Sequence, residues 1–210
     1  MSFQKQRTNR PILLGAAAVA VLAGAYRGLL RNRVRFWGAT QDEATARLPG
    51  DSLIEMPDQV FTRATWINAP PSAVWPWIVQ IGPAPRGGVY TYDWIENLFG
   101  LKMHSANEIL PQFQNPAVGD PVSLGPNVMR IALMEKEESL CWLAEDGNWL
   151  WSFVLREEDG RTRLISRNSF RLPTLGMRVG TVPMEIGSLI MERKMLEGIR
   201  ARAERPNDPL

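Results

Sequence analysis

The sequence predicts an α+β fold, a curved antiparallel sheet wrapped around a long C-terminal helix and preceded by an N-terminal transmembrane helix. Five strand-like segments follow one another between residues 120 and 170, separated by turn sequences at 125–127, 147–148 and 159–160. One long segment with helical periodicity, 183–204, comes last. A run of strands with the helices outside it is typical of an α+β domain.

The first elements of the body are a strand and two helices. Residues 59–68 are rich in β-branched and aromatic side chains, which predicts a strand. The helix predicted over 69–81 starts at two prolines, which the first helical turn tolerates because its N–H groups need no partner. A second short helix is predicted over 91–98 and ends at Gly100. The preceding segment, 37–58, is expected to be irregular.

The remaining strands are predicted in close succession. Trp149, Trp151 and Phe153 alternate with more mixed residues, as expected for a sheet with one buried face. The predicted strand ranges are 120–124, 128–135, 139–144, 149–157 and 161–170.

The last helix is predicted to have an apolar and a charged face. Wrapping the sheet around it would bury an apolar stripe made of Met184, Ile186, Ile190, Met191, Met195, Ile199 and Ala203. The charged side chains have the spacing of local ion pairs, so we expect a solvated face without a catalytic role. These charged residues are Glu192, Arg193, Lys194 and Glu197.

Charge is distributed unevenly along the chain. Residues 1–36 carry seven Lys and Arg and no acid, whereas the 17 basic and 22 acidic residues from position 37 on give the body a net charge of −5. A body that is negative overall and lacks a basic stripe is a poor nucleic-acid binder, so we expect no nucleic-acid partner. The chain thus divides into a basic leader (1–36), one domain (37–205) and a tail (206–210).

Within the leader, residues 11–26 carry no charge and are flanked by Arg10 and Arg27. As a helix this stretch spans about 24 Å, and extension to residue 30 brings it near the ~30 Å of a hydrocarbon core. The favoured interpretation is a single-pass membrane anchor over 11–30 with the body on the cytoplasmic side, although the flanking charges are nearly balanced. The alternatives are a cleaved signal peptide ending at 23–25 and an ordinary helix of the folded body.

Residue counts exclude several chemistries. The single cysteine, Cys141, allows no disulfide within the chain and no zinc site of paired cysteines, and its apolar neighbours are typical of an inert core thiol. The single histidine, His104, excludes sites with several histidine ligands. Residues 82–88 lack the Lys-Ser/Thr of a phosphate-binding loop. We therefore expect neither a metal nor a cofactor.

Seven segments carry a family resemblance: WGAT (37–40), LPGD (48–51), INAPPSAVWPWIVQIG (67–82), GGVYTYDWIENLFGL (87–101), VGDPV (118–122), WSFVL (151–155) and MERKMLEGI (191–199). They resemble the SRPBCC superfamily, the START and polyketide-cyclase-like helix-grip proteins, and within it the uncharacterised bacterial members, some of which have an apolar N-terminal leader. The resemblance implies a cavity between the sheet and the last helix that holds an apolar or amphipathic molecule. It carries over no catalytic residue, because the superfamily shares a fold and not a catalytic set.

The candidate ligand-binding residues come from the glycine- and aromatic-rich stretch 86–94, from the strands, and from the last helix. Glycines let a backbone approach a ligand closely, aromatic side chains offer flat apolar area, and methionines adapt to irregular shapes. An ordinary role in core packing or in a local hydrogen bond stays open for each. The candidates are Arg86, Tyr90, Tyr92, Trp94, His104, Trp142, Trp151, Met191 and Met195.

Three functional hypotheses follow. The favoured one is a membrane-tethered protein that binds a hydrophobic or amphipathic small molecule, such as a lipid, between the sheet and the last helix. The second is an enzyme in the same cavity that cyclises or dehydrates a polyketide-like substrate, with His104, Asp93 or Tyr92 as acid or base. The third is an interaction domain with a filled core. An enclosed cavity above about 300 Å³ between the sheet and the last helix separates the first two from the third.

Overall fold

The computed structural model describes residues 24–174, 176 and 181–205, and the chain divides into two compact units, 1–34 and 35–210. In the first unit, a π-helical turn (Tyr26–Leu30) continues into α2 (Arg31–Arg35). Most of the predicted anchor over 11–30, and the tail over 206–210, lie outside the described residues. No helix in the described part of the chain combines the length and hydropathy that a membrane crossing requires.

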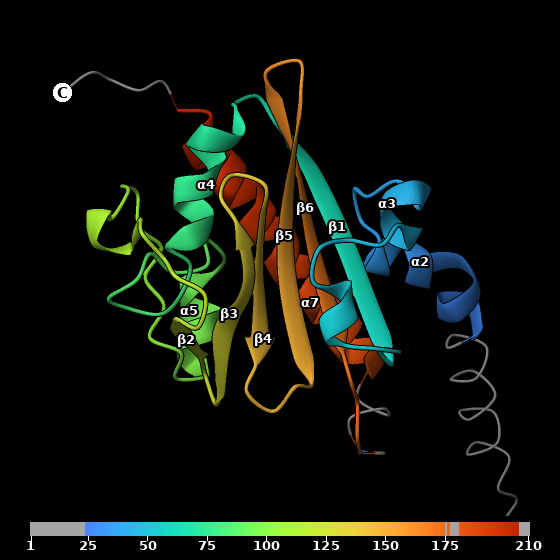
Figure 1. The fold of residues 1–210 in the computed structure, drawn as a ribbon. Coiled ribbons are helices and arrows are strands. Elements are labelled where there is room, and N and C mark those ends of the chain that lie inside the picture. Colours follow the sequence, from blue (N-terminus) through green and yellow to red (C-terminus); the bar gives the residue numbers. More distant parts are fainter. Residues whose placement is uncertain (1–23, 175, 177–180, 206–210) are drawn as a thin grey trace, which may run out of the picture. The chain divides into compact units, whose positions relative to one another are not determined.

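The second unit is built on one six-stranded antiparallel sheet (Figure 1). Strands β2 to β6 pair with their sequence neighbours, and β1 pairs with β6, which gives the order β1-β6-β5-β4-β3-β2. The predicted strands are therefore confirmed to within a few residues. Their bounds are β1 (Gln59–Ile67), β2 (Pro121–Leu124), β3 (Asn127–Glu135), β4 (Ser139–Ala144), β5 (Trp149–Glu158) and β6 (Arg161–Phe170).

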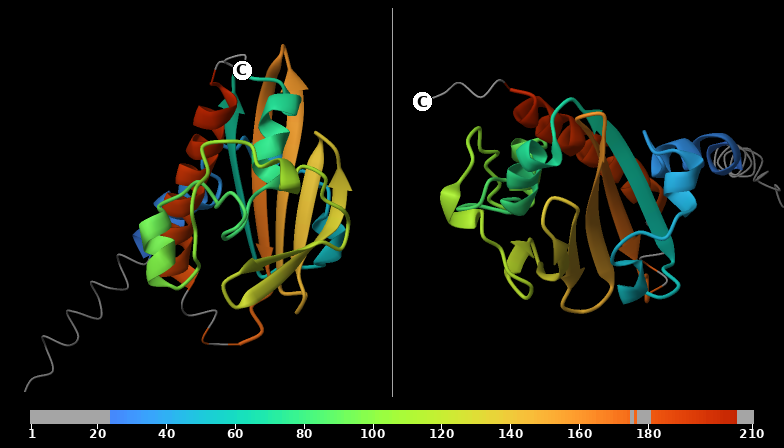
Figure 2. Two further views of the ribbon diagram at one scale, coloured as in Figure 1. Left: turned by 90° about the vertical axis from the view of Figure 1, so that its left-hand side faces the viewer. Right: turned by 45° about the horizontal axis from the view of Figure 1, so that its top comes forward.

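Two helices cover one face of the sheet, which we call the inner face. Helix α4 (Pro71–Val79) and the long α7 (Thr181–Ala203) lie side by side on it, as Figure 2 shows. The short α5 (Asp93–Leu98) follows α4 in the chain, and a 3₁₀ turn (Pro111–Phe113) precedes β2. The predicted α+β fold with a C-terminal helix against a curved antiparallel sheet is confirmed.

Within the second unit, residues 38–54 cover the opposite, outer face. They contain α3 (Gln41–Thr45) and a 3₁₀ turn (Asp51–Leu53), so the expectation of an irregular segment is wrong here. Helix α3 starts at a capping box: Thr40 Oγ1 accepts from the Glu43 amide at 3.1 Å, and the Glu43 carboxylate accepts from the Thr40 amide at 2.7 Å. The sequence carries this signal as Thr-x-x-Glu.

Alternation along the strands sends side chains to the two faces in turn. On β6, Leu164 points to the inner face and joins the main core, whereas Ile165 points to the outer face and joins a smaller cluster. Most of the buried apolar residues belong to the inner core, which includes Ile78 of α4 and Leu196 of α7. The inner core therefore sets how the two helices lie on the sheet.

The C-terminal half of α7 packs closely against the loop before α5. A Cβ atom added at Gly198 would lie 2.5 Å from the carbonyl oxygen of Tyr90, so only glycine fits there. One turn later, Arg202 donates to the carbonyl of Ala106 at 2.7 Å, and its guanidinium lies 4.6 Å from the ring centre of Tyr90. This end of α7 is fixed to the loop by direct contact.

Candidate functional site

A cavity of about 380 Å³, open to solvent and not enclosed, lies between the inner face of the sheet, α7 and the chain segment 89–103. Its volume falls in the range of about 300 to 1,000 Å³ that is usual for small-molecule sites. The principal lining residues are Trp149, Trp151, Asn168 and Phe170 from the sheet, Ser188, Met191, Glu192 and Met195 from α7, and Thr91, Glu96, Leu101 and Met103 from the segment.

The sheet side of the cavity is an aromatic wall. The rings of Trp149 and Phe170 are stacked, with centres 5.7 Å apart and planes 18° from parallel, and Trp149 stacks in the same way on Trp151 at 6.1 Å. Trp142, on β4, packs behind Trp151 with ring centres 5.7 Å apart. The wall offers a ligand a flat apolar surface with π-faces.

Polar side chains of β6 lie directly beside this wall. The antiparallel register places Trp151 opposite Asn168 on the inner face. The indole N–H of Trp149 donates to Asn168 Oδ1 at 2.8 Å, and the indole N–H of Trp151 donates to Ser166 Oγ at 3.1 Å. Each indole plane is therefore held by a hydrogen bond to the neighbouring strand.

Ser166 and Asn168 in turn donate hydrogen bonds to Glu192 of α7. Ser166 Oγ donates to Glu192 Oε1 at 2.5 Å, and the Asn168 amide donates to the same oxygen at 3.1 Å. An indole N–H can only donate, so Ser166 accepts from Trp151 and its own proton points to the glutamate. Glu192 is the acceptor at the end of both chains, which is the role of an ionised carboxylate.

The counter-ion of Glu192 is Arg63 of β1. Arg63 is fully buried, donates to Glu192 Oε2, and also donates to Ser188 Oγ at 2.7 Å. Burial raises the pKa of Glu192, while the charge of Arg63 and the hydrogen bonds from Arg63, Ser166 and Asn168 act to lower it. The ion pair thus joins α7 to the sheet at the cavity.

The prediction that Glu192 belongs to a solvated face is wrong. The residue is only 7% exposed, because it lies one helical turn from Ser188 and from Leu196, on the side of α7 that faces the sheet. The prediction is confirmed for Arg193 and Glu197, an exposed pair whose Nε and Oε1 atoms are 2.8 Å apart.

The predicted apolar stripe of α7 is only half correct. Met195, Ile199 and Ala203 in the second half of α7 are buried, as expected, whereas Met184, Ile186 and Ile190 in the first half are exposed. In that first half, the polar side chains Glu185 and Glu192 are buried and Ser188 is half-buried. The stripe fails because the inner face opposite this half carries polar groups.

On the other side of the cavity, α5 turns Glu96 inward. The helix is held by Asn97, which donates to the carbonyl of Met103 at 2.9 Å and accepts from its amide at 2.6 Å. Asp93 at the start of α5 accepts from the amide and the hydroxyl of Ser105, at 2.7 and 2.6 Å. These two anchors bring Glu96 to the cavity, where it is 8% exposed.

Glu96 differs from Glu192 in its partners. No donor among the described residues forms a hydrogen bond with Glu96 Oε2, and the nearby Thr91 Oγ1 also has no partner of normal geometry. Burial raises the pKa of Glu96, the nearby Thr91 hydroxyl acts to lower it, and the negative charge of Asp93 adds to the rise. Buried polar atoms normally form hydrogen bonds. Glu96 Oε2 and Thr91 Oγ1 therefore mark the place in the cavity where a polar group of a ligand could bind.

Three of the predicted ligand-binding residues, Trp151, Met191 and Met195, lie in the cavity wall. Two others do structural work. Tyr90 is buried and its hydroxyl donates to the carbonyl of Trp77 at 2.8 Å. Arg86 donates to the carbonyls at the end of α4, including that of Ile81 at 2.8 Å, and therefore caps this helix. The ligand-binding role of the first three stays a prediction.

The remaining predicted residues lie outside the cavity wall. Tyr92 is 38% exposed, with Lys194 Nζ 5.7 Å from its ring centre, and Trp94 is 66% exposed. His104 is exposed and lines, with Arg86, a separate depression of about 430 Å³. Both carboxylate oxygens of Asp93 accept from Ser105. The cavity does not bring together the predicted acid and base candidates.

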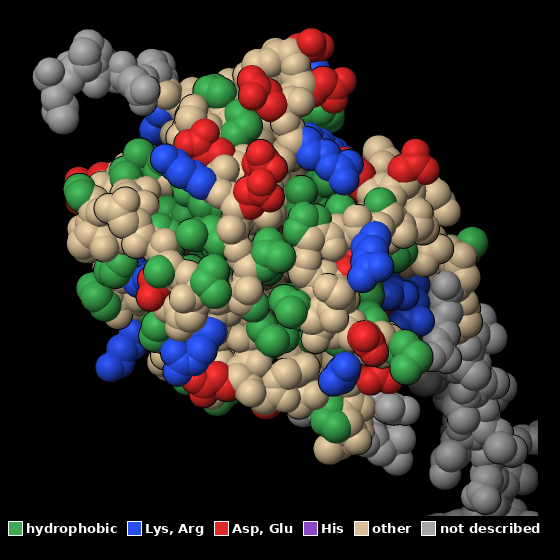
Figure 3. Space-filling model, viewed as in Figure 1, with side chains coloured by type: hydrophobic (Ala, Val, Ile, Leu, Met, Phe, Trp, Pro, Cys, Tyr) green, Lys and Arg blue, Asp and Glu red, His purple; other side chains and the backbone are tan. Residues whose placement is uncertain are grey.

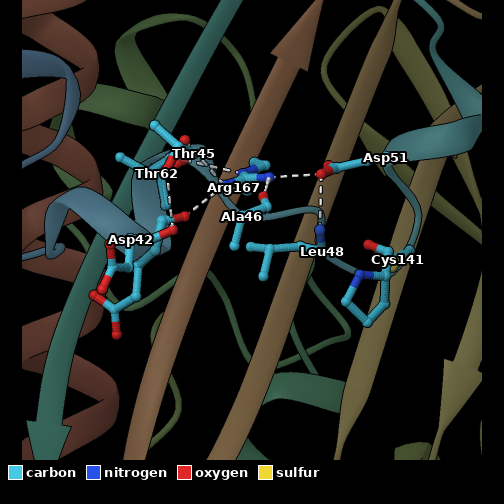
Figure 4. A network of polar contacts seen from close by, with 11 residues as sticks. Asp42, Thr45, Ala46, Leu48, Asp51, Thr62, Cys141 and Arg167 are labelled. Atoms are coloured by element: carbon cyan, nitrogen blue, oxygen red, sulfur yellow. Dashed lines mark hydrogen bonds and ion pairs between the residues drawn. The ribbon is translucent and has the colours of Figure 1, made fainter.

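A second polar network covers the outer face (Figure 4). Each nitrogen of the Arg167 guanidinium donates within the protein, to Thr62 Oγ1 at 3.0 Å, to Asp51 Oδ2 at 2.5 Å and to the carbonyl of Ala46 at 2.9 Å among others. A depression of about 590 Å³ lies beside it, between Arg167 and residues 44–57. Because Arg167 is already saturated, it offers this depression no free donor.

Arg163, two residues earlier on β6, binds Glu43 of α3 with two parallel hydrogen bonds of 2.7 Å each. The hydrogen bond from Arg163 is the main cause that lowers the pKa of Glu43.

On the surface shown in Figure 3, charged side chains of both signs are scattered among hydrophobic ones.

No family model and no curated protein matches the chain. Among solved structures, protein MLL2253 from Mesorhizobium loti is 16% identical, with 71% of this chain and 99% of that chain covered and a TM-score of 0.44. The Polyketide_cyc-like protein Cgl2372 from Corynebacterium glutamicum is 16% identical (72% and 97% covered, TM-score 0.39). Protein SSP2350 from Staphylococcus saprophyticus is 12% identical (70% and 92% covered, TM-score 0.46). At these TM-scores the likenesses carry no functional argument, and the architecture rests on the chain's own strand order.

Proposed function

We propose that the body is an SRPBCC-type helix-grip protein whose inner cavity binds an amphipathic small molecule with a flat apolar portion. The observation that carries this proposal is the cavity of about 380 Å³, with an aromatic wall on one side and a few polar groups on the others. Such a combination gives a ligand apolar contact and a defined orientation.

The wall is formed before a ligand arrives, which supports this proposal. Trp149 and Trp151 are held through Asn168 and Ser166, and these two side chains are held by Glu192. A ligand that stacks on the wall therefore does not need to order it first. Avoiding that entropy cost increases affinity for a given contact area.

The test is the binding of a neutral aromatic probe, 1-naphthalenemethanol, to the purified full chain by isothermal titration calorimetry. We expect one bound probe per chain. Met191→Trp places a larger side chain in the cavity wall and should weaken binding at least about tenfold. Ile190→Trp is the matched control, because Ile190 is the neighbouring residue of α7, is 51% exposed and does not line the cavity.

Two outcomes contradict the proposal. One is a wild-type chain that does not bind the probe. The other is equal binding by both tryptophan variants and the wild type, which would place the probe elsewhere. Circular dichroism of each variant separates a loss of binding from a loss of folding.

Attachment to a membrane through residues 11–30 is a second part of the proposal, supported by the uncharged stretch between Arg10 and Arg27. We expect the full chain in the membrane fraction of lysed host cells, resistant to high salt. A variant without residues 1–34 should leave that fraction. The same distribution for both chains would remove this part of the proposal and leave the cavity unaffected.

The second candidate function is an enzyme, and Glu96 is the observation that favours it. A buried carboxyl group with a raised pKa and no partner on Oε2 suits proton transfer. Proton exchange at the α-carbon of 2-tetralone in D₂O, followed by NMR, tests this role. Faster exchange with the wild type than with Glu96→Gln supports it, and equal rates exclude it for this ketone.

A further inference from the structure

The charges in the cavity wall are both negative. Among the described residues that line it, Glu96 and Glu192 are the charged ones. Glu192 is neutralised by the buried Arg63, which approaches it from the sheet. Glu96 has no cationic side chain paired with it in the described part of the chain, and the charged group that acts on it, Asp93, is also an acid. The uncompensated charge of the cavity is therefore negative and lies at Glu96.

The polar atoms around this charge are a carboxylate oxygen, which can only accept, and the Thr91 hydroxyl, which can donate to Glu96 and still accept a hydrogen bond. Glu96 is more than nine-tenths buried, and neither its Oε2 nor Thr91 Oγ1 has a hydrogen-bond partner within the described chain. A protonated amine has three N–H donors and no acceptor, which matches two or more acceptor groups. A hydroxyl group supplies one donor, and a carboxylate supplies none.

The aromatic wall favours the same ligand class. A cation close to the face of an indole is attracted by the ring quadrupole, and the attraction is stronger in a desolvated site. Trp149 and Trp151 lie in the wall of the cavity that Glu96 also lines. An anionic ligand would meet no cationic side chain among the described lining residues, and the nearest one, Arg63, is already bound to Glu192 and Ser188.

We infer that the cavity takes an aromatic amine, whose flat body packs against Trp149 and Trp151 and whose protonated amino group donates to Glu96 and Thr91. This inference rests on the proposed ligand-binding function and names its ligand class. The charge-assisted hydrogen bond to Glu96 provides the selectivity for the amine, and the aromatic wall provides the apolar contact.

Three probes with one naphthalene body and different polar groups test the inference: 1-naphthalenemethylamine, 1-naphthalenemethanol and 1-naphthoate. Their affinities for the full chain are measured by calorimetry at pH 7. We expect the amine to bind about tenfold more tightly than the alcohol, and the carboxylate to bind most weakly.

Glu96→Gln isolates the charge of this side chain while keeping its shape. We expect the variant to lose the preference for the amine and to bind the alcohol as the wild type does. Thr91→Val should weaken amine binding by a smaller factor, because it removes one neutral acceptor. Glu197→Gln is the control, since it makes the same charge change at an exposed position of α7.

The outcomes separate this inference from the function on which it rests. If none of the three probes binds, the ligand-binding function itself fails. If the three bind equally, or if the amine keeps its advantage in Glu96→Gln, the cavity binds ligands but the amine assignment is wrong. If the carboxylate binds most tightly, the charge argument is reversed and the inference is overturned.

Discussion

The two faces of the sheet carry the same kind of ion pair in different surroundings. On the outer face, Arg163 binds Glu43 of α3 with two hydrogen bonds of 2.7 Å, and the pKa of Glu43 is lowered. On the inner face, Arg63 binds Glu192 of α7, and burial raises the pKa of Glu192. An ion pair between a strand arginine and a helix glutamate therefore does not by itself indicate a ligand-binding site.

The neighbours of each pair make the difference. Glu43 also caps its own helix through Thr40, so the outer pair fastens a short helix to the sheet. Glu192 instead ends two hydrogen-bond chains that begin at the tryptophans of the cavity wall. The outer pair fastens a helix to the sheet, whereas the inner pair lies beside the cavity and holds its aromatic wall.

The largest expected effect comes from breaking the inner pair. Glu192→Leu leaves the buried Arg63 without its counter-ion, and we expect a loss of about 3–5 kcal/mol in the free energy of unfolding. Replacing both residues, with Arg63→Met added, should recover much of this loss, because an apolar pair of similar size avoids the unpaired charge. Urea unfolding of the full chain measures both changes.

Glu197→Gln is the matched control on the same helix, because Glu197 is 45% exposed and its ion pair with Arg193 is solvated. We expect a change below about 0.5 kcal/mol. A Glu192 variant that is no more destabilised than Glu197→Gln would show that the inner pair does not hold α7 to the sheet.

A smaller effect is expected at the outer pair. Glu43→Gln keeps the shape of the side chain but removes its charge, which should cost about 1–2 kcal/mol at pH 7. Since the folded state lowers the pKa of Glu43 from its ordinary value of 4.5, its contribution is fully present above that pH. The contribution is lost as the pH falls through the folded-state pKa. The stability difference between variant and wild type should therefore shrink below pH 4.5, and a constant difference would contradict this account.

The smallest change, with the opposite sign, is expected at Glu96. Its folded-state pKa is raised, so its protonated form favours folding below the ordinary value of 4.5, and that contribution is lost as the pH rises through the folded-state pKa. Glu96→Gln removes a buried charge that has no cationic partner among the described residues and should raise the stability of the ligand-free chain by about 1 kcal/mol at pH 7. The gain should vanish in acid. A loss of stability would mean that Glu96 has a structural partner.

Most of the fold could be predicted because its signals are local. The turn residues at 125–127, 147–148 and 159–160 separate the strands as expected, and alternation on β5 identifies the inner face. Helix α3 was also available from sequence, since Thr40 and Glu43 have capping-box spacing. The anchor prediction over 11–30 stays a prediction.

The site was harder to predict because its charges depend on distant partners. Glu192 lies among charged neighbours and resembles a solvated residue, and its burial is decided by Arg63, which is 129 positions away in the chain. The one available signal was on β6, where Ser166 and Asn168 are polar at positions that alternation assigns to the inner face. Glu96 gave no signal, because the inward turn of α5 depends on Asn97 binding Met103.

The contact between Gly198 and Tyr90 limits the length of what the cavity can hold. The lining residues of α7 end at Met195, and one turn later the helix backbone meets the loop with no room for a side chain. If the cavity binds a ligand as proposed, a longer ligand would find no room between α7 and the loop at this point. Gly198 would then limit the length of the ligand without contacting it, because it lets α7 approach the loop at Tyr90.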